Sequence, residues 1–332
     1  MNEIAEMAAT PPDADSSRKK RRRPSGRTEC GLGLLASLIG LLASRAGYLW
    51  IGFDIFAQFT VHFAIAAAAF LIGLLLPRAR VFSALVLILA GVVALGLWPH
   101  LASRDVRTLA AVPEGHRQIK VASLNLWYAN RNYDAVRAEI LRLDADVVTL
   151  IEIHRDKRPM LDALKASYPY QATCFTIDYC NLAVLSKVPI VESDARVRWV
   201  GAPMIRAKLG PELGGLTVIG VHAIRFPHSR AQFRQVTALS DLIETIPGRK
   251  LVMGDFNSTA FSRILETMVS RTNLVRLTNL PSWPATFGLP QVAIDHIFVS
   301  RGIIQTKSQQ IGEPSGSDHY PITLSIAVPL GP

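Results

Sequence analysis

The chain has 332 residues, 49% of them hydrophobic, and a mean hydropathy of +0.25, which argues against a purely soluble enzyme. The apolar excess lies mainly between Gly31 and Leu101. The part from about residue 118 onward has ordinary globular composition and is long enough for one domain with a sizeable core. The net charge is +10, and the part after residue 100 carries 26 Lys/Arg against 20 Asp/Glu. This mild basic excess favours phosphate-bearing or anionic-membrane partners, but it is also typical of plain solubility.

The first segment, residues 1–30, is rich in Ala, Pro, Ser and charge and has no apolar periodicity, which predicts a disordered tail. It contains six consecutive basic residues, 18–23, followed by Pro-Ser-Gly. Such a run is typical of a nucleic-acid patch or a nuclear signal. Because a long apolar stretch begins a few residues later, we interpret it as a determinant of membrane topology.

Three apolar segments follow: Gly31–Trp50, Phe56–Leu76 and Val81–Trp98. Crossing a hydrocarbon core takes on the order of 20 residues, so the second and third segments predict membrane spans. The first contains Arg45, which is near its distal end and can extend its charge to the interface. A cleaved signal peptide is the alternative for this segment, but the two further spans favour an anchor.

The loop charges predict the orientation of these spans. The basic tail and the loop with Arg78 and Arg80 are positive, whereas the loop between the first two spans has Asp54 and no Lys or Arg. If positive loops stay in the cytoplasm, three crossings place everything after Trp98 outside. We therefore expect a multi-pass inner-membrane protein with a periplasmic or extracellular catalytic domain. The predicted organisation is a cytoplasmic tail (1–30), a transmembrane region (31–101), a hydrated linker (102–117) and a catalytic domain (118–332).

The cysteines leave two possibilities open. Cys174 and Cys180 are six residues apart in the predicted external domain, where they form either a local disulfide or two thiols. Cys30, at a membrane edge, is interpreted as structural.

Strand and helix patterns alternate after the linker, which predicts an α/β or α+β domain whose sheets are covered by helices. The predicted strands are Ile119–Leu126, Val147–Ile153, Asn181–Ser186, Ile205–Leu209, Leu216–His222, Lys250–Gly254, Val292–Ser300 and Pro321–Val328. The predicted helices are Tyr133–Leu143, Arg158–Ser167, His228–Thr245 and Ser262–Val269.

Most of these strands are apolar and carry an acid, an amide or an imidazole at or beside one end. These residues are Asn125, Glu152, His222, Asp255 with Asn257, Asp295 with His296, and Asp318 with His319. Each has an ordinary structural explanation by itself, but six such positions in series predict one catalytic rim of a rigid sheet.

The residue types indicate phosphoester hydrolysis. Carboxylate and amide oxygens without a cysteine cluster suit Mg²⁺, Mn²⁺ or Ca²⁺. The reaction needs a cation, a base for the attacking water and donors for the phosphoryl oxygens. Glu152 can supply the metal site, His319 the base, and Asn257 with His222 the donors. Asp295 is available to fix the tautomer of the base.

The ordered motifs resemble those of the endonuclease/exonuclease/phosphatase superfamily, the deoxyribonuclease-I-like fold, over about residues 118–328. They are Ser123-Leu124-Asn125, Leu150-Ile151-Glu152, Gly220-Val221-His222, Gly254-Asp255-Phe256-Asn257, Ile294-Asp295-His296-Ile297 and Ser317-Asp318-His319-Tyr320-Pro321. The three preceding spans make the layout similar to a bacterial membrane-anchored branch of that superfamily.

The resemblance implies an α+β fold, a four-layer α/β/β/α sandwich of two mixed sheets preceded by about three transmembrane helices. It implies that Glu152 binds the metal and that Asn125 and Asp318 support or share that site. His222 would contact the scissile phosphate, and Asp255 would position groups or transfer a proton.

The resemblance also implies that Asn257 holds a phosphate oxygen and that His319, oriented by Asp295, activates the water. Direct contact of His319 with the phosphate is the rival assignment. Two positions depart from the family pattern: Ile151 replaces a frequent Gln, and Asn181 replaces a loop Gly. Neither removes a catalytic group, so we expect an active enzyme.

The substrate stays open, because this fold serves many phosphoesters. The first hypothesis is a metal-dependent phosphodiesterase or nuclease, the second a lipid or small-molecule phosphatase, and the third an inactive membrane receptor for phosphorylated ligands. Nucleic acid and lipid headgroups are the expected partners, with no protein partner inferable. For a nuclease, the candidate backbone contacts are Arg206, Arg225, Arg230 and Arg234, for which ordinary solvated charge is the alternative. Trp283 and Phe287 are predicted either to line the cleft or to pack in the core.

Overall fold

The computed structural model describes residues 26–76, 80–104 and 107–331. The predicted basic run at 18–23 and Arg78 lie outside the described residues. Helix α1 begins at Gly26, so its first turn includes the last residues of the predicted tail.

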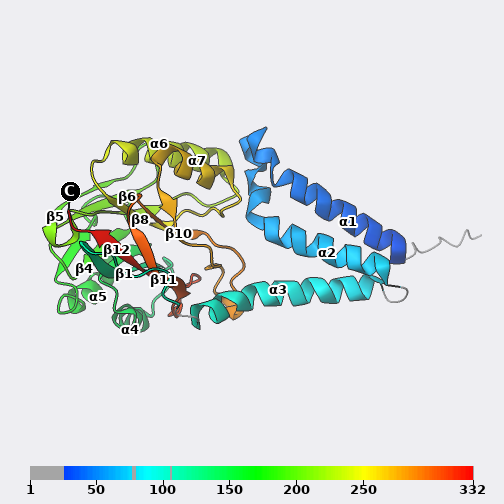
Figure 1. Cartoon of the computed structure of the whole chain (residues 1–332), viewed down its shortest axis with the longest axis horizontal. Helices are drawn as coiled ribbons and strands as arrows, with labels where there is room; N and C mark the ends of the chain where they lie inside the picture. The colour runs from blue at the N-terminus through cyan, green and yellow to red at the C-terminus, as the bar shows by residue number, and fades with distance from the viewer. Residues whose placement is uncertain (1–25, 77–79, 105–106, 332) are drawn as a thin grey trace, which may run out of the picture.

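Three apolar helical segments precede the globular domain and extend from one end of it (Figure 1). They comprise α1 (Gly26–Ala43) with the short 3-10 turn η1 (Ala46–Tyr48), the 3-10 segment η2 (Ile51–Phe59) continuing into α2 (Thr60–Leu75), and α3 (Arg80–Arg104). Each is long and apolar enough to cross a membrane. The prediction of three candidate membrane-spanning helices ahead of the domain is therefore confirmed.

Twelve strands of the described chain form two six-stranded mixed sheets. The first sheet has the order β11 (Ile304–Ile311), β12 (Ile322–Pro329), β1 (His116–Asn125), β2 (Val147–Ile151), β4 (Leu182–Ser186) and β3 (Tyr170–Thr173). The second has the order β5 (Ile190–Arg196), β6 (Met204–Leu209), β7 (Thr217–His222), β8 (Lys250–Asp255), β10 (Asp295–Val299) and β9 (Val275–Arg276). Each sheet contains one parallel pair, β1 with β2 and β7 with β8, among antiparallel neighbours.

Three apolar clusters divide the domain into four layers. The largest lies between the sheets, where side chains such as Val121 and Val184 meet Val218 and Met253. A second cluster joins the outer face of the first sheet to α4 (Tyr133–Leu143) and α5 (Arg158–Ala163). The third joins the second sheet to α6 (Ser229–Thr245) and α7 (Arg263–Thr272). The predicted four-layer α+β sandwich is thus confirmed, and Figure 1 shows α6 and α7 on the side opposite α4 and α5.

The predicted strands correspond to the eight inner strands of the two sheets. The four strands that the sequence pattern misses, β3, β5, β9 and β11, are the four edge strands. An edge strand is covered less completely and needs no continuous apolar run. In β5, for example, no residue is buried, and β11 contains two register irregularities.

Two covalent and local details concern the segments around the sheets. Cys174 and Cys180 form a disulfide with a Cα–Cα distance of 5.6 Å, which selects one of the two possibilities left open by the sequence. Residues of the predicted linker are partly ordered, because Thr108 forms a β-bridge with Lys307 of β11.

Candidate active site

The six predicted strand-end positions meet at one edge of the sandwich. Asn125, His222 and Asp255 are the last residues of β1, β7 and β8, and Glu152 directly follows β2. Asp295 begins β10, which runs antiparallel to β8 and places Asp295 opposite Asp255. The remaining predicted residues, Asn257, Asp318 and His319, follow β8 or precede β12 on the same edge.

The backbone around these strand ends depends on particular residues. Gly254 has φ +152°, and a Cβ atom there would lie 2.0 Å from the carbonyl oxygen of Val221. Glu152 and Asn257 have φ values of 58° and 49°, which non-glycine residues adopt at a cost of order 1–3 kcal/mol. The local folds of the Gly-Asp-Phe-Asn segment and of the turn after β2 therefore store strain where the functional side chains lie.

Glu152 forms one wall of the site together with Asn125. Asn125 Nδ2 donates to Glu152 Oε1 at 3.2 Å, and the backbone N–H of Tyr128 donates to Glu152 Oε2 at 2.7 Å. His222 Nε2 lies 3.6 Å from Glu152 Oε1. These three neighbours hold the Glu152 side chain in place. It is 19% exposed and therefore remains accessible from the pocket.

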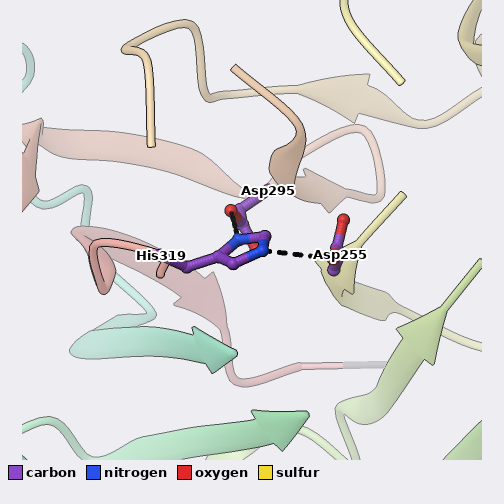
Figure 2. Close-up of side chains that lie close together, drawn as sticks. All are labelled: Asp255, Asp295 and His319. Carbon is purple, nitrogen blue, oxygen red and sulfur yellow. Dashed lines mark hydrogen bonds and ion pairs between the residues drawn. The ribbon is translucent and has the colours of Figure 1, made fainter. Parts of the chain in front are cut away.

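His319 and Asp295 form a buried pair, shown in Figure 2. His319 Nδ1–H donates to Asp295 Oδ2 at 2.8 Å, and the hydroxyl of Ser282 donates to the same oxygen at 2.6 Å. Because Nδ1 is occupied, Nε2 is the nitrogen that faces the site. It lies 3.8 Å from Asp255 Oδ2 and 4.0 Å from Asp318 Oδ1.

Asp255 is the central carboxylate and is 1% exposed. Its Oδ2 accepts hydrogen bonds from Asn125 Nδ2 at 3.0 Å and from Asn257 Nδ2 at 3.1 Å. Its Oδ1 accepts from the backbone N–H of Asn257 at 2.7 Å. Asp255 therefore joins the Glu152 wall, with which it shares the Asn125 amide, to the His319 pair, whose Nε2 lies 3.8 Å from Asp255 Oδ2.

Burial and neighbouring charge shift the pKa values of His319 and His222 in opposite directions. Burial lowers the pKa of His319, but the charge and hydrogen bond of Asp295, with the charges of Asp255 and Asp318, outweigh it and raise that pKa to about 10. Burial lowers the pKa of His222, although the charge of Glu152 opposes the shift. Burial, with the charge of Asp295, raises the pKa of the Asp255 carboxyl to about 8. At neutral pH His319 is therefore charged and His222 neutral.

Two groups of side chains bear on metal binding. Asp255, Asp295 and His319 offer ligand atoms within 4.8 Å of one another, but Asp295 Oδ2 already accepts two hydrogen bonds and all three residues are buried. Glu152 and Asp318 present partly exposed carboxylates to the pocket. Mg²⁺ takes one or two carboxylates and keeps several waters, so these accessible carboxylates fit the predicted cation better than the buried trio.

A pocket of about 600 Å³ opens over these groups. Glu152, His222, Asp255, Asn257, Asp318 and His319 line it, while Asn125 and Asp295 lie behind these side chains. The structure therefore brings all eight predicted site residues together.

The arginines that were candidates for substrate-backbone contacts lie in different environments. Arg225 lines the pocket, whereas Arg206 pairs with Glu192 and Asp194 on β5 and β6. The guanidinium of Arg230 lies over the ring of Trp50, 5.1 Å from its centroid.

Only one of the two aromatic candidates, Trp283 and Phe287, lies at the pocket. Trp283 lines the pocket and donates from Nε1 to Asp318 Oδ2 at 3.2 Å. Phe287 neither lines the pocket nor packs in the core, because it is 94% exposed. Both alternatives predicted for Phe287 are therefore wrong. His296, which the sequence places beside Asp295, is fully buried and bonds to Ser258 O and Thr278 Oγ1, so it belongs to the core.

Sequence reasoning missed several supporting groups. Ser282 bonds to Asp295, and the hydroxyl of Ser317 donates to the carbonyl of Asn125 at 2.7 Å. Lys157, 1% exposed, donates to the carbonyls of Trp127 and Glu152. Ser317 begins a motif that was recognised, but no local pattern distinguishes Ser282 or Lys157 from ordinary loop residues.

The fold and the site define a phosphoester hydrolase with a two-sheet sandwich. The sequence profile described as "Endonuclease/Exonuclease/phosphatase family" matches residues 122–319, and the chain belongs to this family of ester-bond hydrolases. A comparison with curated protein sequences gives no significant match.

Solved structures share the fold at low sequence identity. A beta toxin mutant from Staphylococcus aureus with bound magnesium ions is 18% identical, with a TM-score of 0.53 over 63% of this chain and 99% of that one. A family protein from Bacteroides thetaiotaomicron is 16% identical, with a TM-score of 0.52 over 64% and 98%. TDP2 from D. rerio in complex with a single-strand DNA product is 14% identical, with a TM-score of 0.52 over 63% and 98%.

Proposed function

We propose that this protein is a membrane-anchored, divalent-metal-dependent phosphodiesterase whose catalytic domain lies outside the cytoplasm. The observation that carries the proposal is the convergence of eight acidic, amide and imidazole side chains from both sheets, six of which line one pocket while two support them from behind. A catalyst for phosphoester hydrolysis needs this combination, because negative charge must be neutralised while a proton moves from water to the leaving oxygen.

In this proposal Glu152 and Asp318 hold Mg²⁺ or Mn²⁺, with Ca²⁺ as a further candidate. The bound cation would neutralise charge on the phosphate. Asn125 supports the site from behind, because its amide N–H groups fix both Glu152 and Asp255. The beta toxin structure with magnesium ions supports the choice of metal by similarity of fold.

The phosphate would lie between His222, Asn257 and His319, which all line the pocket. His222 donates to a phosphoryl oxygen in this arrangement, and Asn257 would do so by releasing the carbonyl of Ala223, to which its Nδ2 donates at 3.0 Å. Asp295 holds His319 Nδ1, so that Nε2 either accepts a proton from water or donates to the phosphate. The raised pKa of His319 supports the second role, and the raised pKa of Asp255 makes this carboxyl a proton donor at neutral pH.

The proposed orientation rests on charge and on the disulfide. Arg80 begins α3, on the side that the sequence assigns to the cytoplasm, and the Cys174–Cys180 disulfide suits an oxidising compartment. Alkaline phosphatase fused after Leu101 should be active in a bacterial host. An inactive fusion would reverse the orientation.

The enzymatic proposal is tested with the full chain in detergent, using bis-p-nitrophenyl phosphate as diester and p-nitrophenyl phosphate as monoester. We expect diester hydrolysis with Mg²⁺ or Mn²⁺ that EDTA abolishes and that His319→Ala lowers by at least about 100-fold. His116→Ala, at the start of β1, is the matched control. Activity that survives both EDTA and His319→Ala would refute the mechanism, and no turnover of either ester would favour a receptor.

A further inference from the structure

The catalytic domain is fixed to the apolar helices by a buried polar joint. Asp54 of η2 is 1% exposed and accepts hydrogen bonds from the hydroxyl of Ser262 and, at 2.8 Å, from the backbone N–H of Arg263, where α7 begins. Gln58 Oε1 accepts from the backbone N–H of Thr259 at 2.7 Å. An acid at a helix N-terminus satisfies free N–H groups. The orientation of the pocket relative to the helices is therefore defined.

A second contact joins α3 to the loop that leads away from the pocket. Figure 1 shows this orange segment beside α3, and it includes the 3-10 turn η5 (Thr286–Gly288). His100 Nε2–H donates to the carbonyl of Gly288 at 2.9 Å, and Gln291 Nε2 donates to the carbonyl of Val92 at 3.1 Å. A Cβ atom on Gly96 would lie 2.7 Å from a side-chain atom of the loop, so the glycine permits the close approach.

An aromatic row connects the pocket to the helices. The rings of Phe226 and Trp283, which both line the pocket, are 6.1 Å apart, and Phe226 lies 6.1 Å from Phe59 at the end of η2. Trp283 also begins the loop that contacts α3. One wall of the active site therefore faces the side of the domain from which the helices emerge.

The loop carries one highly exposed apolar side chain, that of Phe287. Phe287 has φ +62° and is 94% exposed, although burying a phenylalanine is favourable by about 1.5–3 kcal/mol. With Arg80 at the inner boundary of the bilayer, Gly96 lies about 24 Å along α3, inside a hydrocarbon core about 30 Å thick. The loop beside Gly96 then lies at the level of the outer leaflet. Phe287 adjoins Gly288, whose carbonyl contacts His100, and so lies about 30 Å along α3, near the outer boundary of the hydrocarbon core.

We infer that the loop 284–291 contacts the outer leaflet through Phe287, and that the substrate is a phosphodiester lipid of the same bilayer. This inference rests on the proposed function and on the proposed membrane anchoring. Hydrolysis joins the oxygen of water to the lipid phosphorus and breaks one P–O ester bond. One proton of the water passes to the leaving alcohol oxygen, and the other stays on or leaves the new phosphate oxygen.

The pocket favours a lipid headgroup over a nucleic acid. Of the described residues that line it, one is an arginine, Arg225, and none is a lysine. A nucleic-acid groove needs a track of basic residues along the backbone. Arg206 and Arg230, which are candidates for such a track, contact other protein groups instead.

The placement of Phe287 is tested by fluorescence quenching. The full chain carries Cys30→Ala and Phe287→Cys, is labelled with an environment-sensitive fluorophore and is reconstituted into phosphatidylcholine–phosphatidylglycerol vesicles. We expect quenching by spin-labelled lipid at Phe287→Cys and none at Val191→Cys. Val191 is 60% exposed on β5, at the end of the domain opposite the helices (Figure 1). An unquenched label at residue 287 overturns the inference.

The substrate is tested with Phe287→Asn, because asparagine adopts positive φ readily and removes only the apolar ring. In the same vesicles we expect the parent to release a phosphorylated headgroup or phosphatidate. The rate of this release should fall by at least about fivefold in Phe287→Asn. Hydrolysis of bis-p-nitrophenyl phosphate should be unchanged, and Val191→Asn should alter neither rate. Cleavage of the soluble diester and of single-stranded DNA without lipid turnover overturns the lipid inference but keeps the proposed function. Failure with all three substrates overturns the proposed function itself.

Discussion

Replacing Asp295 by asparagine tests the buried pair that orients His319. The change keeps the size of the side chain but removes its charge, in a position that is 1% exposed. Asp295 Oδ2 accepts from both His319 Nδ1 and Ser282 Oγ, and Oδ1 has no hydrogen-bond partner among the described residues. An amide with its NH₂ toward His319 requires an unprotonated Nδ1 and therefore a neutral ring. An amide with its NH₂ at the Oδ1 position leaves a buried donor unsatisfied.

The expected magnitude follows from the hydrogen bond that is lost. A bond between charged groups contributes about 1.5–3 kcal/mol, so kcat should fall about 10- to 150-fold in Asp295→Asn. Ser282→Ala is the matched comparison, because it removes a bond to the same oxygen and leaves the charge in place. It should lower kcat by no more than about tenfold.

The assay is steady-state hydrolysis of bis-p-nitrophenyl phosphate by the full chain, with the thermal midpoint measured on the same samples. A folded Asp295→Asn variant with kcat within about twofold of the parent would show that this pair does not orient the catalytic imidazole.

Three further predictions concern metal, pH and backbone. Glu152→Gln should raise the Mg²⁺ concentration for half-maximal activity by at least about tenfold in a metal titration, whereas the exposed Glu212→Gln should not. Burial, with the charge of a nearby arginine, lowers the pKa of His296 to about 3, so the folded state keeps this ring neutral while the unfolded chain binds a proton below about pH 6.5. Stability is therefore lost as pH falls from about 6.5 toward 3, by up to about 1.4 kcal/mol per pH unit, and thermal midpoints should show a shallower decline for His296→Gln. Gly254→Ala should lower the thermal midpoint far more than Gly302→Ala, because a Cβ atom at residue 302 meets nothing within 4 Å.

Each of these predictions has a contradicting result. If Glu152→Gln and its parent need the same Mg²⁺ concentration for half-maximal activity, Glu152 does not bind the cation. If the thermal midpoints of His296→Gln and the parent fall equally with pH, protonation of His296 does not cause the loss of stability in acid. Similar thermal midpoints for the two alanine variants would show that the turn before Asp255 tolerates a side chain.

The sequence predicted the interior of the sandwich because interior strands must be apolar on both faces. Seven of the eight inner strands carry continuous buried runs, such as all five residues of β2 and all but one of β8, and β6 alternates apolar and basic residues after its first two positions. The edge strand β5 has the pattern of a polar loop, and only its pairing with β6 defines it. Strand ends were informative for the same reason, since polar residues that interrupt buried runs need a function or a partner.

Contacts between segments far apart in the chain had no signal in the sequence. Asp54 and Ser262 are separated by 208 positions, and neither belongs to a recognisable motif, yet they form the joint between the helices and the domain. The sequence predicts that Phe287 lines the cleft or packs in the core, because Phe287 lies shortly before the strand that carries Asp295. In the structure Phe287 has a positive φ within η5 and is exposed, and local composition reveals neither feature.

The proposed mechanism requires side chains from both sheets to surround one cation and one phosphorus atom. The most direct measurement is a crystal structure of the full chain with Mn²⁺ and inorganic phosphate, with manganese located by anomalous scattering. We expect manganese at Glu152 and Asp318, and phosphate oxygens within hydrogen-bond distance of His222, Asn257 and His319. Manganese between Asp255 and Asp295, or phosphate bound outside this pocket, would contradict the mechanism.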